Sequence, residues 1–278
     1  MNSVYTLLEK VRREKPVIHH VTNWVTIYDC ANIVKVFGAS PVMAHAKEEV
    51  SEMAKIASAV VLNIGTLTPE LVEAMKIAAR SANEKGIPVV LDVCGAGATK
   101  LRDEKSLELL NEVKIDIIKG NASEVARIAG EDVQTRGVDA SEVGANLREM
   151  GRDLARERDC TVVITGKEDI VCDPTKLLLV KNGTEMMAHI VGTGCMAASV
   201  IGTFAAVERD LAVASASGLS CFEIAAEVAA GEASGPGTFK ERLFDAVYAL
   251  DRELIEKRQK VETVQERSSL HPHPWKSV

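Results

Sequence analysis

The stretch Ala59-Val60-Val61-Leu62-Asn63-Ile64 is joined to Pro88-Val89-Val90-Leu91-Asp92 by residues with the pattern of a single helix. Both segments are continuous apolar runs rather than alternating ones, which is typical of parallel strands covered on both faces. Between them, Thr68 is a suitable N-cap, Pro69 suits the first helical position and Gly86 suits the helix end. The stretch therefore predicts a strand–helix–strand unit of a parallel sheet.

The segments on either side of this unit continue the alternation of strand and helix. Apolar runs predict further parallel strands at residues 17–21, 115–119 and 160–165, and two antiparallel edge strands at 170–173 and 176–180. Apolar residues at helical spacing predict helices at 4–14, 27–37, 47–57, 104–112, 138–159, 193–208, 211–230 and 240–259. This order predicts an α/β fold with a central, mostly parallel sheet.

No internal repeat and no linker divides the chain. We therefore expect one domain over residues 1–262. Residues 263–278 contain an adjacent serine pair, two prolines and two histidines, and we expect them to form a disordered tail.

The composition is that of a globular protein with an aliphatic core. Of the 278 residues, 46% are apolar, 26% are charged and only 4% are aromatic. The net charge of −7 argues against non-specific nucleic-acid binding, which requires a basic face. No apolar run reaches the length that we expect of a membrane span, and the first residues lack a signal pattern. We therefore expect a cytoplasmic protein that binds neither nucleic acid nor membrane.

The six cysteines are scattered, and no two of them form a C-x-x-C pair. This spacing gives no recognisable zinc or redox motif. In a reducing compartment we expect six free thiols, most of them buried. The adjacent pair His19-His20 has no cysteine or acid at metal-ligand spacing, and we interpret it as structural.

The sequence Gly192-Thr193-Gly194-Cys195 precedes an apolar helix and has the composition of an anion site. A Gly-Thr-Gly turn directs backbone N–H groups into one concavity, and the helix adds the positive end of its dipole. The most natural anion is a phosphate. Cys195 falls on the first helical turn, where the helix lowers the pKa of its thiol. From these residues alone, a simple turn followed by a buried cysteine is the alternative.

Polar residues follow several predicted strands, at the edge where open α/β sheets bind ligands. Asp92 begins a second loop of small residues, so its carboxylate suits Mg²⁺ held between protein and phosphate oxygens. Lys119 ends the next strand and suits neutralising a phosphate. Glu124 suits the outer shell of a metal, or it is simply a favourable acid in a first helical turn. Asn23 either contacts a ligand or caps the helix that follows it.

Seven short blocks occur in an order that is characteristic of one family. They are Val21-Thr22-Asn23, Gly38-Ala39-Ser40-Pro41-Val42-Met43-Ala44, Leu62-Asn63-Ile64-Gly65-Thr66-Leu67, Asp92-Val93-Cys94-Gly95-Ala96-Gly97-Ala98-Thr99, Ile118-Lys119-Gly120-Asn121-Ala122-Ser123-Glu124, Val163-Ile164-Thr165-Gly166 and Gly192-Thr193-Gly194-Cys195. Any one block is a weak signal, but seven in order are a strong one. Over residues 4–250, the chain resembles the hydroxyethylthiazole kinase family.

This resemblance implies a fold, an activity and an assembly. The fold is ribokinase-like: a single domain in which a central, mostly parallel sheet lies between two helical layers. The activity is ATP-dependent, Mg²⁺-dependent phosphorylation of the hydroxyl of 4-methyl-5-(2-hydroxyethyl)thiazole, in thiamine biosynthesis and salvage. Members of the family resemble one another in forming homotrimers, with the thiazole site near the subunit interface, and we expect the same here.

The resemblance also implies roles for individual residues. The residues that match the functional positions of the family are, for the substrate, Met43, Asn23 and Gly192; for ATP, Lys119 and Thr165; for the metal, Asp92 and Glu124; and for catalysis, Thr193, Gly194 and Cys195. The last three are expected to bind the transferring γ-phosphate. Cys195 either removes the proton of the substrate hydroxyl, as a poor general base, or positions that hydroxyl.

The chain departs from the usual pattern of the family at two places. Val93 and Cys94 stand where the family usually has Pro-Val, which relaxes the loop after Asp92 and which we expect to be tolerated. Lys119 stands where the family more often has Arg, so a point charge replaces a bidentate donor. We expect the second change to weaken ATP binding without abolishing it.

Three other functions remain open at this level. The first alternative is another vitamin-precursor or sugar kinase of the same fold, for example one for hydroxymethylpyrimidine. Met43 favours an apolar heteroaromatic alcohol over this alternative. The second alternative is a non-catalytic protein that binds a nucleotide or a thiazole. The retention of Asp92 and Glu124 counts against it. The third alternative is a thiol-dependent redox protein that uses Cys195. This function would require that folding bring Cys94 close to Cys195.

Overall fold

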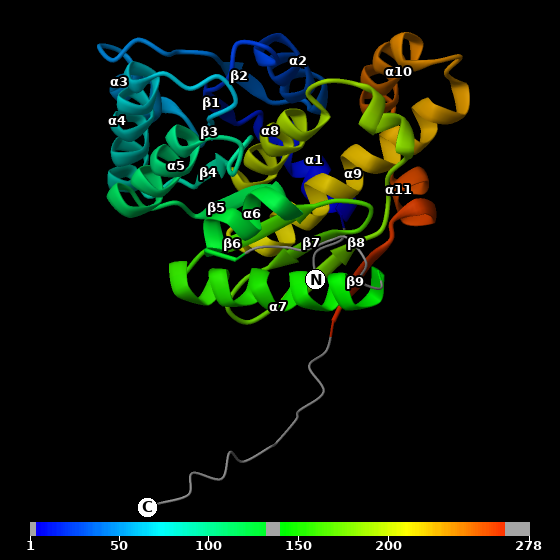
Figure 1. Ribbon diagram of the computed structural model, residues 1–278. Coiled ribbons are helices and arrows are strands. Elements are labelled where there is room, and N and C mark those ends of the chain that lie inside the picture. The colour runs from blue at the N-terminus through cyan, green and yellow to red at the C-terminus, as the bar shows by residue number, and fades with distance from the viewer. Residues whose placement is uncertain (1–3, 132–139, 265–278) are drawn as a thin grey trace, which may run out of the picture.

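One nine-stranded sheet forms the centre of the protein (Figure 1). The structure is a computed structural model that describes residues 4–131 and 140–264. Of the expected tail at 263–278, Thr263 instead belongs to a strand and the Val264 N–H donates to the Leu177 carbonyl, while the rest lies outside the described residues. The strand order is β2-β1-β3-β4-β5-β6-β7-β8-β9. The strands are β1 (Val17–Val21), β2 (Ser40–Val42), β3 (Ala59–Asn63), β4 (Val89–Asp92), β5 (Ile117–Asn121), β6 (Thr161–Thr165), β7 (Asp169–Cys172), β8 (Leu177–Val180) and β9 (Val261–Thr263).

Helices connect the strands and end the chain. They are α1 (Val4–Glu14), α2 (Ile27–Phe37), α3 (Val50–Ile56), α4 (Pro69–Lys85), α5 (Lys100–Glu112), α6 (Ala122–Ala129), α7 (Ala140–Arg158), the short 3₁₀ helix η1 (Glu185–His189), α8 (Thr193–Ala205), α9 (Leu211–Glu232), α10 (Pro236–Tyr248) and α11 (Arg252–Arg258). The predicted unit around α4 is confirmed in detail. The Thr68 hydroxyl accepts a hydrogen bond from the Leu71 N–H, and Gly86 ends the helix with a φ of +76°.

The sheet is parallel from β2 to β6 and antiparallel from β6 to β9. The expected mostly parallel sheet with an antiparallel edge is therefore confirmed. Within β4, Val90 packs into one hydrophobic cluster while Val89 and Leu91 pack into the other. The continuous apolar runs of the parallel strands thus serve two cores, one on each face of the sheet.

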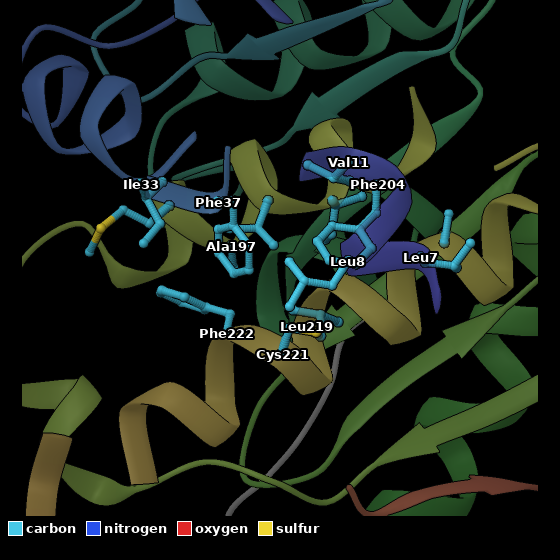
Figure 2. Packing of buried hydrophobic residues seen from close by; sticks show 14 of the residues in the cluster. Leu7, Leu8, Val11, Ile33, Phe37, Ala197, Phe204, Leu219, Cys221 and Phe222 are labelled. Carbon is cyan, nitrogen blue, oxygen red and sulfur yellow. The ribbon is translucent and has the colours of Figure 1, made fainter. Parts of the chain in front are cut away.

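Each face of the sheet is covered by its own set of helices, which gives three layers (Figure 1). On one face lie α1, α2, α8, α9, α10 and α11, and on the other α3, α4, α5, α6 and α7. On the first face, Phe37 of α2 meets Phe204 of α8 edge to face, with ring centroids 5.7 Å apart. Figure 2 shows these two rings with Leu8 of α1 and Phe222 of α9 in the same cluster.

Four expectations about the elements are corrected. The helix predicted at 47–57 begins only at Val50, and the strand predicted at 115–119 is shifted to Ile117–Asn121. The helix predicted at 240–259 is two helices, because the Asp251 side chain accepts the Leu254 N–H and starts α11 anew. Finally, α9 is long and apolar enough to cross a membrane by length and composition, but 83% of its apolar window is buried inside the protein.

Candidate active site

A cavity of about 390 Å³ opens at the carboxyl ends of the parallel strands, beside the N-terminus of α8. Open α/β sheets bind ligands at this edge, because the loops that follow the strands meet there. The cavity is lined by Asn23, Val25, Thr26, Gly65, Thr66, Asp92, Cys94, Lys119, Asn121, Glu124, Thr165, Val191, Gly192, Gly194 and Cys195. Most of the residues expected from the sequence are therefore brought together here.

The first turn of α8 forms one wall of the cavity. Gly192 is the N-cap in a left-handed conformation, with φ of +99°, and no side chain caps the helix. The first N–H groups of a helix have no partner within it, so those of Thr193, Gly194 and Cys195 are available to a ligand. With the positive end of the helix dipole they favour an anion. The expected position of Cys195 on this first turn is confirmed.

The two glycines of this turn lie close to neighbouring side chains, and the contact is tightest at Gly192. A Cβ atom added at Gly192 would lie 2.7 Å from Thr26 Cγ2, and one added at Gly194 would lie 3.2 Å from Lys119 Nζ. The missing side chain at residue 194 therefore lets the lysine ammonium come close to the helix N-terminus. Both features add positive charge on the same side of the cavity.

Lys119 and Asp92 form a buried ion pair on the neighbouring strands β5 and β4. Lys119 Nζ lies 3.3 Å from each carboxylate oxygen of Asp92, and the two residues are 4% and 0% exposed. Burial raises the pKa of Asp92 to about 7, an effect that Lys119 opposes and that the charges of Cys195 and Glu124 reinforce. For Lys119, burial favours the neutral form, but Asp92 and the other anions outweigh it and raise the pKa. The lysine is therefore charged at neutral pH.

The Cys195 thiol has its pKa lowered to about 5. The largest cause is a hydrogen bond from the Cys94 thiol; burial opposes it, and Thr26, the Lys119 charge and Asn63 add to it. The Asn23 amide nitrogen also lies 3.4 Å from Cys195 Sγ. These contacts favour the thiolate form of Cys195. Folding brings Cys94 beside it, and the Cys94 pKa is raised, first by this same hydrogen bond and then by burial.

Comparison with known proteins identifies the family. A model described as the hydroxyethylthiazole kinase family matches residues 8–253 of this chain. The chain belongs to this family. The hydroxyethylthiazole kinase of Methanosarcina acetivorans is 52% identical over 255 residues, which cover 92% of this chain and 98% of that protein.

Solved structures agree with the family and the fold. A hydroxyethylthiazole kinase protein from Pyrococcus horikoshii OT3 superposes with a TM-score of 0.88 at 40% identity, covering 94% of this chain and 99% of that one. A ribokinase-like superfamily protein from Enterococcus faecalis has a TM-score of 0.59 at 12% identity, covering 83% and 86%. The second likeness shows the fold alone. The ribokinase-like fold expected from the sequence is confirmed.

Glu124, one of the two expected metal acids, also holds backbone in place. Its Oε2 accepts the Asn121 N–H and its Oε1 accepts the Gly95 N–H, each at 2.8 Å. The first contact completes a capping box at the start of α6. Glu124 is therefore also a favourable acid in a first helical turn, which was the simpler of its two interpretations. The second contact ties the loop after Asp92 to the loop after β5. Glu124 still lines the cavity, and its charge reaches Asp92.

Thr165, Thr193 and Met43 were also expected at the site, and each makes a different contribution to the cavity. Thr165, the last residue of β6, lines it, and its hydroxyl donates to the Gly120 carbonyl at 3.3 Å. The Thr193 hydroxyl donates to the Met187 carbonyl, so this residue offers the cavity its backbone. Met43 follows β2 and is not among the cavity-lining residues of the described chain.

The polar residues Thr26, Thr66 and Asn121 line the cavity but were not assigned to it from the sequence. Two further polar residues, which hold the surrounding loops in place, were missed as well. Asn63, at the end of β3, hydrogen-bonds to both Asn23 and Asp92. Arg102 of α5 donates to the carbonyls of Ile64, Gly65 and Cys94, and so joins the loops after β3 and β4. Asn63 occurs in a quoted block and follows an apolar run, which is a signal that was available. Arg102 has no local signal, because its partners are distant in sequence.

Proposed function

We propose that this protein transfers the γ-phosphoryl group of ATP to the hydroxyl of 4-methyl-5-(2-hydroxyethyl)thiazole. The observation that carries the proposal is the uncapped N-terminus of α8 facing the buried Lys119–Asp92 pair, in a chain of the hydroxyethylthiazole kinase family. Phosphoryl transfer needs positioning and charge stabilisation more than covalent chemistry. Both are available at this cavity.

The transferring phosphate is proposed to bind at the first turn of α8. The N–H groups of Thr193, Gly194 and Cys195 would donate to its oxygens, and Lys119 would neutralise charge from the facing strand. Such donors are fixed before reaction and work in a site with little water, which makes them effective in the transition state. Thr165, at the end of β6, is proposed as a further ATP contact.

The carboxylates of Asp92 and Glu124 fit a magnesium site that is shared with ATP. Mg²⁺ is usually held by one or two carboxylates together with waters and substrate phosphates. The described residues contain no group of three or more His, Cys, Asp or Glu side chains that would hold a metal without a substrate. The buried Asp92, with its raised pKa, is an acid that a cation would stabilise. When bound, Mg²⁺ would neutralise charge on the phosphates.

The Cys195 thiolate is proposed to accept a hydrogen bond from the substrate hydroxyl. With its pKa lowered to about 5, it is a weak base toward an alcohol. Early removal of the proton contributes little when the transition state is loose. We therefore favour orientation of the hydroxyl over proton abstraction. Asn23 and Gly192 line the same cavity and are proposed as substrate contacts.

The thiazole site is proposed to be completed in a homotrimer. Four large hydrophobic residues near the cavity are exposed, namely Trp24 (55%), Val25 (67%), Tyr28 (76%) and Val191 (73%). Val25 and Val191 also line the cavity. A neighbouring copy that covers these side chains would supply the apolar surface that a thiazole ring requires, and Met43 is the proposed thiazole contact in such an assembly. We also propose that the enzyme acts in the cytoplasm, where ATP is available.

The decisive experiment measures ADP release from ATP and Mg²⁺ in the presence of different alcohols. We expect turnover with 4-methyl-5-(2-hydroxyethyl)thiazole and none above background with ribose or hydroxymethylpyrimidine. Turnover with hydroxymethylpyrimidine alone would favour the other vitamin-precursor kinase. ATP binding without turnover of any alcohol would contradict the kinase proposal and favour a binding protein.

A further inference from the structure

Three polar side chains form a row across neighbouring parallel strands at the base of the cavity. Asn63 of β3 is in register with Asp92 of β4, and Asp92 is in register with Lys119 of β5. The Asn63 amide nitrogen donates to Asp92 Oδ2 at 2.8 Å, and Lys119 Nζ contacts both oxygens of the same carboxylate. Asp92 is therefore held from both sides, by a neutral donor and by a cation.

The orientation of the Asn63 carboxamide is fixed by its other partners. Its oxygen accepts the Asn23 amide at 3.0 Å and the Gly65 N–H at 2.8 Å, and the residue is 1% exposed. An amide oxygen has two acceptor positions, so both are used. Turning the amide over would place its oxygen against a carboxylate and its nitrogen against two N–H donors. Only one orientation satisfies the surrounding groups.

The contacts continue from Asn63 to the thiolate. Asn23 uses the same amide nitrogen to contact Asn63 Oδ1 and Cys195 Sγ, at 3.0 and 3.4 Å. Its own oxygen accepts the N–H groups of Val25 and Thr26 and the Thr26 hydroxyl, which fixes the Asn23 side chain as well. A continuous path therefore joins Asp92, Asn63, Asn23 and Cys195.

We propose that Asn63 is a positioning residue of this site, which fixes the Asp92 carboxylate and, through Asn23, the Cys195 sulfur relative to each other. Its influence on turnover rests on the proposed function. Asp92 would hold the metal that is shared with ATP, and Cys195 would orient the substrate hydroxyl, so their relative placement sets the alignment of the reacting groups. Small misplacements of such groups are costly, because transfer depends on near-attack geometry.

The neutral charge of Asn63 is part of this role. The Asp92 carboxylate accepts from the Asn63 amide, and the Cys195 sulfur contacts the Asn23 amide further along the same path. A carboxamide satisfies them without adding a third negative charge. A carboxylate at residue 63 would have nearly the same shape but would lose the donor to Asp92 and would add repulsion.

The test compares Asn63→Asp and Asn63→Ser with the matched control Asn83→Asp. Asn83 also makes two side-chain hydrogen bonds, to the backbone of Lys114, but at the opposite edge of the sheet. The first readout is the pH dependence of iodoacetamide labelling at Cys195, assigned by peptide mass spectrometry. The second is the separation of kcat from KM in the ADP assay.

For Asn63→Asp we expect the midpoint of Cys195 labelling to rise by about one pH unit or more, because a negative charge is placed near the thiolate. We expect kcat to fall about 10- to 100-fold in both Asn63 variants, with a much smaller change in KM for the thiazole alcohol. Asn83→Asp should change neither the labelling midpoint nor kcat.

Unchanged labelling and kcat in the Asn63 variants would overturn the proposal. Equal losses in the Asn63 and Asn83 variants, or failure of both Asn63 variants to fold, would make Asn63 a structural residue and would equally overturn it. Failure of the proposed function is distinguishable. In that case the wild-type protein turns over no alcohol, while the labelling midpoint still shifts in Asn63→Asp.

Discussion

Gly192 and Thr26 meet so closely that a Cβ atom at residue 192 would lie 2.7 Å from Thr26 Cγ2. Gly192 also has a φ of +99°, in the region that favours glycine. Gly192→Ala should therefore lower the free energy of unfolding by about 1–3 kcal/mol, and it should raise KM for ATP by displacing the first turn of α8. Thermal melts and ATP titrations of the ADP assay measure the two effects.

Gly231→Ala is the matched control for Gly192→Ala. Gly231 lies within α9, and no atom lies within 4 Å of a Cβ added there. Alanine is favoured over glycine in a helix, so this control should leave stability unchanged or slightly increased. A Gly192→Ala protein with wild-type melting temperature and KM would show that the close approach to Thr26 is easily relieved.

Cys94→Val should raise the pKa of Cys195 from about 5 toward its ordinary value, because the hydrogen bond from Cys94 is the largest cause of the lowered pKa. The midpoint of Cys195 labelling by iodoacetamide should move to higher pH accordingly. We expect activity to survive, since valine is the residue that the family usually has there. Cys160→Val is a control, because Cys160 is a buried thiol outside the cavity and its pKa is raised by burial to about 12.

Cys195→Ser and Cys195→Ala distinguish the two roles left open for the thiolate. If Cys195 orients the substrate hydroxyl, serine should keep a hydrogen-bonding oxygen in place and should lose less than about 100-fold in kcat. Alanine should lose more, because it offers no acceptor. If both variants instead lose the same amount of kcat, and more than about 100-fold, proton removal is assigned to the thiolate. The ADP assay at saturating substrate gives the comparison.

Much of the fold was predictable because its signals are local. The apolar runs of β3 and β4, and the Thr68 and Gly86 caps of α4, each lie within a few residues of the element that they define. The edge strand β9 was not predictable in this way. It pairs with β8, about eighty positions earlier in the chain, and its residues Val261-Glu262-Thr263 carry no apolar run.

As with the fold, the parts of the site that have local signals could be predicted from the sequence. Asp92, Lys119 and the α8 turn belong to short motifs, and the family resemblance carried them to named positions. Asn63 was missed although it follows an apolar run, because the sequence does not show which polar group it meets. Only the register of β3 against β4 places it beside Asp92. Met43 shows the converse, since the resemblance names it although it is not among the residues that line the cavity of the described chain.

Tyr28→Lys should weaken the proposed homotrimer, because it places a charge on an exposed apolar surface that a second copy would cover. Light scattering coupled to size exclusion measures the mass, and we expect the variant to dissociate at lower protein concentration than the wild type. Tyr248→Lys is the control, since Tyr248 is equally exposed at the end of α10. A monomeric wild-type protein, or equal effects of both changes, would contradict the assembly.

The activity should have an acidic limb near pH 7, set by Asp92. Its pKa is raised to about 7 by burial, and Lys119 opposes that rise. Only the ionised carboxylate can hold Mg²⁺, so kcat/KM should fall as the pH drops below about 7 and the carboxylate gains a proton. Lys119→Met removes the opposing charge, which should raise the pKa of Asp92 further and shift this limb to higher pH. Lys119→Arg keeps the charge and should leave the limb in place. The titration of ATP itself is common to all three proteins, so a limb that does not move in Lys119→Met would show that Asp92 is not the group that titrates.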